Sequence, residues 1–157
     1  MVKVDLFKNI EIFANLTVLE LEQIAALAIE LSYDDDVKLI SEGDPADAFF
    51  IIMKGKVMVS KTASDGTKRF IAHLVSGDLF GEIAILDSFP RSATVSTVGS
   101  VTVLKVEKEM FSKHIQDNLS IGNKILSSLG RNISKQMRIL TKAYIDLAEK
   151  AIIPWSF

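Results

Sequence analysis

The strongest constraint on the fold is a run of short apolar segments between about residues 37 and 106, each closed by residues that favour turns. Phe49–Met53 is continuously apolar, and Ser64–Gly66 can form a hairpin turn because glycine tolerates the positive φ of tight turns. Thr94–Val98 and Val101–Val106 are expected as a last pair of strands around a glycine turn. This rhythm predicts a small antiparallel barrel or sandwich.

Helical patterns flank these strands on both sides. Residues 5–31 are expected to be helical, and Thr17–Glu20 has the sequence of a capping box, in which side chain and backbone at the two ends bond each other. A short helix is expected at about 108–116, and a much longer one begins near Asn118, a suitable N-cap. The chain is therefore predicted to be one α+β domain over residues 1–157, with strands at about 33–106 and C-terminal helices at about 108–151.

The composition excludes several classes of protein. The 157 residues are enough for one domain, and 48% of them are hydrophobic, which is enough for a core. No apolar run approaches the roughly 20 residues that span a bilayer, and the N-terminus lacks the apolar region of a signal peptide. The absence of cysteine excludes thiolate chemistry and fits a reducing cytoplasm, the expected location. Neither histidine has a partner at metal-ligand spacing, so no metal is expected.

A candidate anion site lies within Phe80–Val95. Gly81 removes a Cβ where a ligand could approach the backbone, and the segment from Glu82 can form one helical turn with unpaired first amides. The guanidinium of Arg91 fits two phosphate oxygens, and Ser92 can add a hydroxyl. These groups together favour a compact anion such as a phosphate.

Glu82 decides how this site is interpreted. Its carboxylate would repel a phosphate, so it should meet another group, most simply a sugar hydroxyl that donates to it. A phosphate with a neighbouring hydroxyl is found in a cyclic nucleotide. The alternative is that Glu82 and Arg91 form a structural ion pair on a loop.

Several motifs in the same order resemble the cyclic nucleotide-binding domain family. The segments Phe80-Gly81-Glu82-Ile83-Ala84 and Pro90-Arg91-Ser92-Ala93-Thr94-Val95 closely resemble the phosphate-binding cassette of that family. Upstream, the resemblance extends over Ile40–Asp44, Phe50–Ile52, Gly55–Val57 and Gly77-Asp78. The resemblance covers nearly the whole chain, from about Leu6 to the long helix.

The resemblance implies a fold and a set of ligand contacts. The family fold is an antiparallel, jelly-roll-like β-roll of about eight strands, preceded by a helical bundle and followed by two helices. Glu82 would bind the ribose 2′-hydroxyl, Arg91 would bind the cyclic phosphate and Ser92 would help to hold it. Because threonine at the position of Ser92 tends to favour cGMP in the family, the serine favours cAMP, with cGMP left open. The remaining ligand-binding residues implied are Gly81, Ile83, Ala84 and Ala93.

The resemblance also places the base between the roll and the long helix. Val59 and Ile71 are expected on the apolar wall, and Asn132, Gln136 and Met137 are expected near the base. The alternative for Asn132 and Gln136 is a solvent-facing helix surface.

The long helix carries an apolar stripe that predicts a parallel homodimer. The stripe recurs every three or four residues from Leu126 to Ala151, and a helix of about 45 Å is too long for complete burial on a small roll. Basic residues along the helix and the tail Pro154–Phe157 offer a surface for an unidentified effector protein, with a solvated face as the alternative. The family's transcription factors continue into a helix-turn-helix domain; because this chain stops at Phe157, no DNA binding is expected.

The predicted function is that of a stand-alone regulatory sensor that binds a cyclic nucleotide, without cofactor, metal, membrane contact or enzymatic activity. Ligand binding is expected to draw the loop around Arg91 and the C-terminal helices into a closed state. The alternative is an interaction or structural protein that retains the fold without using the ligand, although a buried arginine without its anion would be costly.

Overall fold

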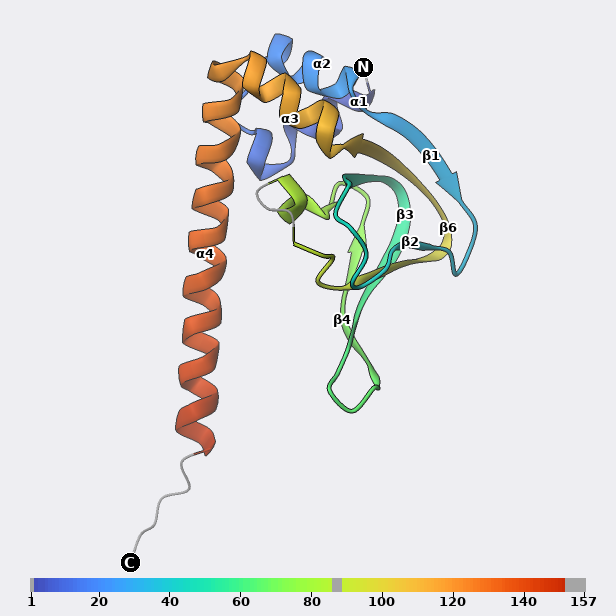
Figure 1. The fold of residues 1–157 in the computed structure, drawn as a ribbon, viewed down its shortest axis with the longest axis vertical. Helices are drawn as coiled ribbons and strands as arrows, with labels where there is room; N and C mark the ends of the chain where they lie inside the picture. Colours follow the sequence, from blue (N-terminus) through green and yellow to red (C-terminus); the bar gives the residue numbers. More distant parts are fainter. Residues whose placement is uncertain (1, 86–88, 152–157) are drawn as a thin grey trace, which may run out of the picture.

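The computed structural model describes residues 2–85 and 89–151 (Figure 1). Short helices and the start of a long helix cover one end of a curved antiparallel sheet, and the long helix extends well beyond it. The elements in chain order are α1 Val2–Lys8, the 3-10 helix η1 Glu11–Phe13, α2 Val18–Ala26, β1 Ile29–Tyr33, β2 Lys38–Ile40, β3 Ala48–Thr62, β4 Lys68–Val75, β5 Leu79–Phe80, the 3-10 helix η2 Glu82–Ile85, β6 Thr94–Glu107, α3 Lys108–Asp117 and α4 Leu119–Ala151.

The sheet is built around two long central strands, β3 and β6. Its order is β1-β6-β3-β4, with β2 paired to β6 and β5 paired to β3, and every pair is antiparallel. The predicted α+β class with an antiparallel β-roll, N-terminal helices and a long C-terminal helix is therefore confirmed.

Six strands, rather than about eight, lie in the described part of the chain. Thr94–Val98 and Val101–Val106 are not a pair, because both belong to the single strand β6 and both pair with β3. In the same way β3 passes through Gly55, where the register shifts. Gly55 has a φ of +95°, and a Cβ there would lie 2.6 Å from the carbonyl oxygen of Ser100. Glycines within a strand mark irregularities of the ladder, so the turn expected between Val98 and Val101 is a position within one continuous strand.

The N-terminal helical region ends earlier than expected. The capping box at Thr17 and Glu20 is confirmed, but α2 ends at Ala26 and residues 29–31 belong to β1 instead of a helix. Glu30 lies opposite Leu104 on β6. Pairing with β6 therefore overrides the local helical periodicity.

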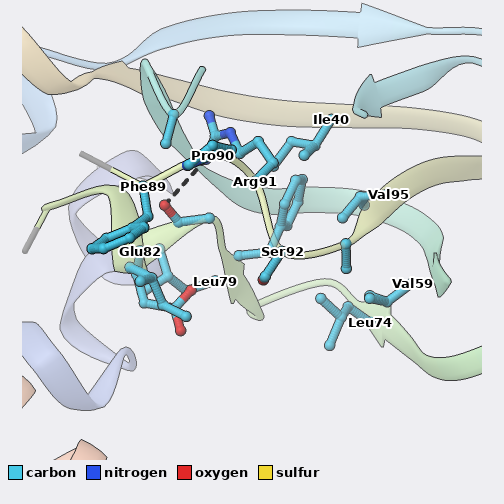
Figure 2. Close-up of a pocket in the computed structure, with 15 residues that line it drawn as sticks. Ile40, Val59, Leu74, Leu79, Glu82, Phe89, Pro90, Arg91, Ser92 and Val95 are labelled. Atoms are coloured by element: carbon cyan, nitrogen blue, oxygen red, sulfur yellow. Dashed lines mark hydrogen bonds between the residues drawn. The ribbon is translucent and has the colours of Figure 1, made fainter. Parts of the chain in front are cut away.

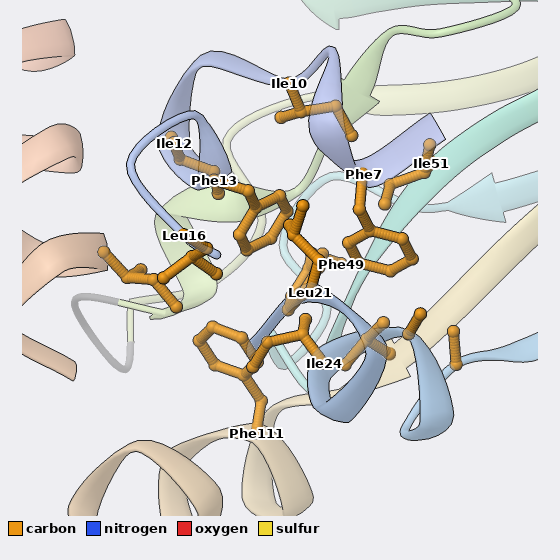
Figure 3. Close-up of a cluster of buried hydrophobic side chains, with 14 of the residues drawn as sticks. Phe7, Ile10, Ile12, Phe13, Leu16, Leu21, Ile24, Phe49, Ile51 and Phe111 are labelled. Carbon is orange, nitrogen blue, oxygen red and sulfur yellow. The ribbon is translucent and has the colours of Figure 1, made fainter. Parts of the chain in front are cut away.

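Two hydrophobic clusters share β3 between them. Phe49 and Ile51 face a helix-side cluster with Phe13 and Phe111, whereas Phe50 and Ile52 face the interior of the roll (Figure 3). Because successive side chains point to opposite faces of a strand, the continuous apolar run is explained by burial on both faces. Phe49 packs edge-to-face on Phe111, with ring centroids 5.1 Å apart.

The C-terminal helices begin close to the expected positions. Asn118 separates α3 from α4, but its side-chain amide donates to the carbonyl of His114 at 2.9 Å and so closes α3, while its own carbonyl accepts from Gly122. The residues 152–157, which include the aromatic tail, lie outside the described part. Among the helices described, none combines the length and the apolar character needed to cross a bilayer.

The first turns of α4 are fixed to the N-terminal helices. Ile121, Ile125 and Leu129 are buried in the helix-side cluster. The ammonium of Lys124 contacts both carboxylate oxygens of Glu20 at 2.8 Å. The Oγ of Ser128, which is buried, accepts from the side chains of Asn15 and Arg131. These contacts hold the base of α4 against the body of the domain.

Candidate functional site

A cavity of about 390 Å³ opens between the roll and the segment that follows β5 (Figure 2). This volume is within the usual range for small-molecule sites. Its wall is mostly apolar and includes the polar residues Glu82, Arg91 and Ser92. The lining residues are Ile40, Ala46, Val59, Leu74, Leu79, Phe80, Gly81, Glu82, Ile83, Phe89, Pro90, Arg91, Ser92, Ala93 and Val95.

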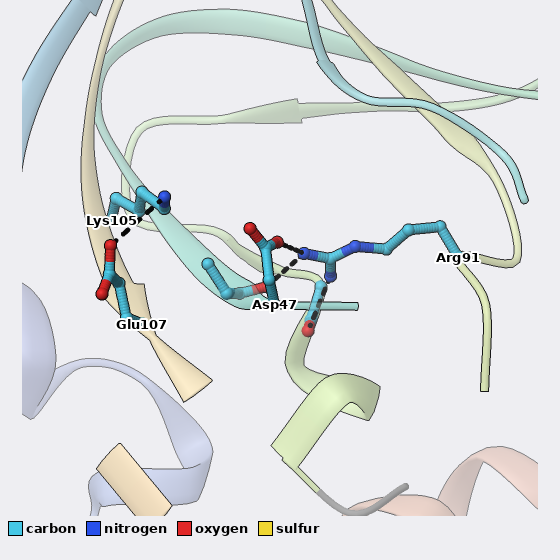
Figure 4. A network of polar contacts seen from close by, with 6 residues as sticks. Asp47, Arg91, Lys105 and Glu107 are labelled. Carbon is cyan, nitrogen blue, oxygen red and sulfur yellow. Dashed lines mark hydrogen bonds and ion pairs between the residues drawn. The ribbon is translucent and has the colours of Figure 1, made fainter. Parts of the chain in front are cut away.

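Arg91 is the most buried charged residue at this cavity, with its side chain 6% exposed. Its Nη2 donates to the carbonyl of Ala48 at 2.6 Å and pairs with the carboxylate of Asp47 at 3.1 Å (Figure 4). Its Nη1 donates to the carbonyl of Gly81 at 3.4 Å. The backbone of Arg91 is also fixed, since its N–H donates to the carbonyl of Asp44. The guanidinium is therefore positioned by β3 and by the turn before it.

Gly81 makes room for this guanidinium. Its φ is +77°, and a Cβ there would lie 2.8 Å from Nη1 of Arg91 and 3.3 Å from the carbonyl oxygen of Ala48. The sequence suggested that the missing Cβ serves the approach of a ligand. In the structure the space is used by Arg91, so the glycine acts on the cavity through the arginine.

Glu82 opens η2 and is half-buried beside the cavity. Burial raises the pKa of its carboxyl group above the ordinary value, and a hydrogen bond from its own backbone N–H partly opposes this effect. Arg91 pairs with Asp47 and not with Glu82. The interpretation of Glu82 and Arg91 as a structural ion pair is therefore wrong. Glu82 is a desolvated acceptor beside an apolar cavity.

The structure brings most of the expected ligand-binding residues to this one cavity. Gly81, Glu82, Ile83, Arg91, Ser92 and Ala93 line it, as does Val59 from the base-pocket set. Ala84 belongs to η2, but its side chain is outside the described part of the structure. The roles of these residues toward a ligand stay predictions.

Four of the residues expected near the base do not line the cavity. Ile71 is the extra residue of a β-bulge, since Ser60 pairs with Phe70 and Val59 pairs with Ala72. The bulge turns Ile71 away from the wall, and it is 53% exposed. Asn132 and Gln136 lie on α4, where the amide of Gln136 donates to the side-chain oxygen of Asn132 at 3.4 Å. Their position fits the alternative of a solvent-facing helix surface, and Met137 is also exposed.

Sequence reasoning missed Leu74 and Asp47. Leu74 lies opposite Val57 on the neighbouring strand and lines the cavity beside Val59. Side chains of β4 alternate between the two faces of the sheet, and counting from the hairpin turn would have identified Leu74 if the bulge at Ile71 had been known. Asp47 is far from Arg91 in sequence, and no local pattern marks it as the counter-ion. Among the residues that the structure describes, no group of three or more His, Asp or Glu side chains is placed to hold a metal ion.

Comparisons with family models and with individual proteins agree on one family. The family model described as "Cyclic nucleotide-binding domain" matches residues 30–118, more than half of the chain. A CRP-like cAMP-activated global transcriptional regulator of Mycobacterium tuberculosis is 30% identical over 115 residues, which is 71% of this chain and 51% of the regulator. A cAMP-dependent protein kinase regulatory subunit of Debaryomyces hansenii is 36% identical over 110 residues, 69% of this chain and 23% of the subunit. The chain thus spans about half the length of the first relative and less of the second.

Solved structures agree with this assignment. The N-terminal domain of a transcriptional regulator from Streptomyces coelicolor A3(2) superposes with a TM-score of 0.78 at 24% identity, over 86% of this chain and 94% of that domain, which supports the fold. The regulatory domain of Toxoplasma gondii PKA with cAMP has a TM-score of 0.68 at 27% identity, over 71% of this chain and 42% of that one. The family model, which matches more than half of the chain, shows that the chain belongs to the cyclic nucleotide-binding domain family.

Proposed function

We propose that this chain binds cAMP in the cavity described above and acts as a regulatory module rather than as an enzyme. The observation that carries the proposal is that a buried arginine and a desolvated carboxylate line the same apolar cavity. A cyclic nucleotide supplies a matching phosphate, ribose hydroxyl and flat base.

The phosphate would bind at Arg91 and Ser92. The hydrogen bonds of Arg91 to Gly81, Asp47 and Ala48 use only part of the N–H donors of a guanidinium, so a phosphate can take the others or displace Asp47. Asp47 is a weak competitor for this position, because its side chain is 72% exposed and water screens its charge. The hydroxyl of Ser92 adds a short, neutral contact at the same cavity wall.

The ribose would bind at Glu82 and the base against the apolar wall. A 2′-hydroxyl can donate to the carboxylate of Glu82, whose desolvation strengthens the bond. Val59, Leu74 and Val95 then offer apolar contacts to the base (Figure 2). The names of the relatives, a cAMP-activated regulator and kinase subunits that depend on cAMP, support cAMP as the ligand.

We also propose that two copies associate in parallel through α4. Leu126, Ile133, Leu140 and Leu147 recur at intervals of seven residues, and all four are at least 40% exposed in the single chain. Met137 and Tyr144 repeat the same interval on the adjoining row. Two rows at this spacing form the seam of a coiled coil. Leucine, which is the main residue of the first row, favours a two-stranded coiled coil when it occupies one of the two core positions of the heptad. Arg138 and Lys142 lie on the other side of the helix and would stay exposed for an effector, whereas Lys124 and Lys135 pair with Glu20 and Glu11.

One observation favours the second candidate, an interaction protein that does not use a ligand. Arg91 already has a carboxylate partner in Asp47 and a carbonyl partner in Ala48, so its burial does not require an external anion. This internal pairing weakens the expectation that burying Arg91 without a bound anion would destabilise the fold. The position of Glu82 opposes this alternative, because a raised carboxyl pKa has no structural benefit without a donor.

Isothermal titration calorimetry with cAMP, cGMP and 5′-AMP tests the proposal. Saturable heat with cAMP, weaker heat with cGMP and little with the acyclic 5′-AMP is the expected result. Absence of binding by both cyclic nucleotides would support the interaction protein instead.

A further inference from the structure

The hairpin formed by β3 and β4 is basic in a chain that is acidic overall. Between residues 54 and 75 there are five lysine and arginine residues and one aspartate, whereas the whole chain has a net charge of −2. That aspartate, Asp65, is already engaged, because its carboxylate accepts from Thr67 and pairs with Arg69 at 3.2 Å. The hairpin therefore presents an excess of positive charge, which favours an acidic partner.

The same hairpin projects from the body of the domain. In Figure 1 its turn extends beyond the other strands, at the end of the sheet away from the short helices. Among the strands that the structure describes, β4 pairs with β3 alone, and none of its residues is buried. A two-stranded ribbon is only marginally stable by itself, so apolar side chains on it gain little from the fold and are available to a partner.

The two faces of the hairpin have different roles. Val59 and Leu74 line the cavity. Because successive side chains of a strand point to opposite faces, Met58 and His73, which lie opposite each other, point away from the cavity. Phe70 shares this outer face, since its ring packs on that of His73 with the centroids 4.9 Å apart. The outer face is therefore separate from the cavity.

The outer face has an apolar centre between two basic ends. Phe70 is 59% exposed and Val75 is 49% exposed. Lys56 lies opposite Val75, and Lys68 lies opposite Thr62, so the two lysines are separated by six residues of strand, or about 20 Å. Apolar centres with a charged rim are typical of interfaces between proteins. We call this face the hairpin surface and define it by Lys56, Met58, Lys68, Phe70, His73 and Val75.

Nearby features argue against three other occupants. The bulge at Ile71 and the lysine at the start of β4 are features that oppose pairing of an edge strand with a second copy. Asp65 occupies the turn, and Glu42 lies beside it, where its carboxylate accepts from the N–H of Thr62. A continuous phosphate backbone or an anionic membrane would therefore meet negative charge at the end of the hairpin, whereas a short acidic segment can avoid it.

We propose that the hairpin surface binds an extended acidic segment of another protein. Two carboxylates of the segment pair with Lys56 and Lys68, and two apolar side chains between them cover Phe70 and Val75. Alternate residues of an extended segment face the same side, so carboxylates about 20 Å apart are six residues apart in its sequence. The inference goes beyond the proposed function and does not depend on it, because the cavity lies on the other face of the hairpin.

The probe is a synthetic peptide with this pattern, acetyl-Glu-Thr-Phe-Thr-Phe-Thr-Glu-amide. Its pattern is the same in both directions, so the orientation of the natural segment does not matter. Titration into isotope-labelled protein without nucleotide, followed by NMR spectroscopy, identifies the amides that respond and gives the dissociation constant. The control peptide has lysine in place of both glutamates.

Two variants test the charge and the apolar centre separately. Lys68→Glu should weaken binding of the peptide about tenfold, because attraction becomes repulsion. Phe70→Ala should weaken it about fivefold through the loss of an aromatic contact. Both side chains are exposed, so the fold should tolerate these changes, and thermal unfolding checks this. Lys113→Glu is the matched control with the same change of charge, because Lys113 is exposed on α3, and it should bind as wild type does.

The expected result is a response of amides in residues 56–62 and in β4 that is lost with the lysine peptide. No response at about 1 mM peptide, or equal affinities of wild type and Lys68→Glu, would overturn the inference. A response of the same amides to a single-stranded thymidine oligonucleotide or to phosphatidylserine vesicles, but not to the peptide, would also overturn it. So would a change in the sedimentation of the peptide-free protein on Lys68→Glu substitution, since a second copy would then occupy the hairpin surface.

Discussion

Arg91 is a buried charge whose partners come from the chain itself. Asp47 and the carbonyl of Ala48 hold its guanidinium, and Gly81 leaves the space that it occupies. A preformed position of this kind lowers the entropic cost of binding, because the arginine side chain is already ordered before the ligand arrives. The cost is competition, since a phosphate must share the arginine with Asp47.

The residues on the cassette could be predicted from sequence, but their supporting contacts could not. Glu82 and Arg91 lie within one short segment, where chemistry and resemblance both identify them. Asp47 is brought to Arg91 only by the pairing of β3 with its neighbours. Ile71 was misplaced because a bulge in β4 shifts the alternation by one residue, and no residue type marks this bulge.

Glu82→Gln should weaken nucleotide binding while making the protein more stable at neutral pH. The folded pKa of Glu82 is raised by burial, so the folded state binds the proton more readily than the unfolded chain does. This difference lowers stability as the pH rises from the ordinary pKa through the raised one, and the penalty is fully present above the raised pKa. Glutamine removes the charge and therefore the penalty.

The same substitution should change the pH dependence of binding. In wild type, cAMP affinity should fall as acidification protonates Glu82, because the carboxylate is a stronger acceptor for the ribose hydroxyl than the neutral acid is. Thermal unfolding and calorimetry between pH 4 and pH 7 measure both effects, as an approximate window set by ordinary carboxyl values. A variant that binds as tightly as wild type across this range would show that Glu82 does not contact the ligand.

Gly81→Ala should lower both stability and affinity. A φ of +77° costs a non-glycine residue about 1–2 kcal/mol, and the new Cβ would press on Nη1 of Arg91. Gly66→Ala is a matched control, because Gly66 has a φ of +80° but a Cβ there would meet nothing within 4 Å. Thermal unfolding should show a loss in both variants, while calorimetry should show weaker cAMP binding only in Gly81→Ala. Equal affinities would mean that the position of Arg91 is unimportant for the ligand.

At the scale of elements, the turns were easier to predict than the bends. The hairpin between β3 and β4 and the capping box of α2 follow from a few adjacent residues, and both are present. The glycine turn at Gly99 was expected to separate two strands, but β6 continues through it, and β3 likewise continues through Gly55. A glycine with positive φ occurs both in turns between strands and at bends within a strand. Whether the chain turns back or continues depends on the pairing with the neighbouring strand.

The length of α4 was also correctly expected, and its exposed seam leads to a prediction about association. Leu140→Lys should disrupt the proposed dimer, because it places a charge within the seam between two copies. Ile139→Lys is the control, since Ile139 is similarly exposed but lies outside the seam. Sedimentation should show a dimer for wild type and Ile139→Lys and a monomer for Leu140→Lys. A monomeric wild type at high micromolar concentration would remove the dimer from the account.

At the scale of the whole molecule, β3 joins the cavity to the helices. Its residues alternate between the interior of the roll, which adjoins the cavity, and the helix-side cluster, which includes Ile125 and Leu129 of α4. Ile85, at the end of η2, packs against the same helix-side cluster. Contiguous packing therefore connects the cassette to the base of α4, as the proposed regulatory role requires.

The central claim is that Arg91 binds the phosphate of a cyclic nucleotide. The most direct measurement is calorimetric titration of cAMP into wild type, Arg91→Ala and Arg69→Ala. Arg69 also pairs with an aspartate, Asp65 at 3.2 Å, but on the exposed hairpin. Arg91→Ala should lose about 2–4 kcal/mol of binding free energy, because a charge-assisted contact to the phosphate is removed. Arg69→Ala should bind as wild type does. Equal affinities of Arg91→Ala and wild type, with both variants folded, would contradict the account.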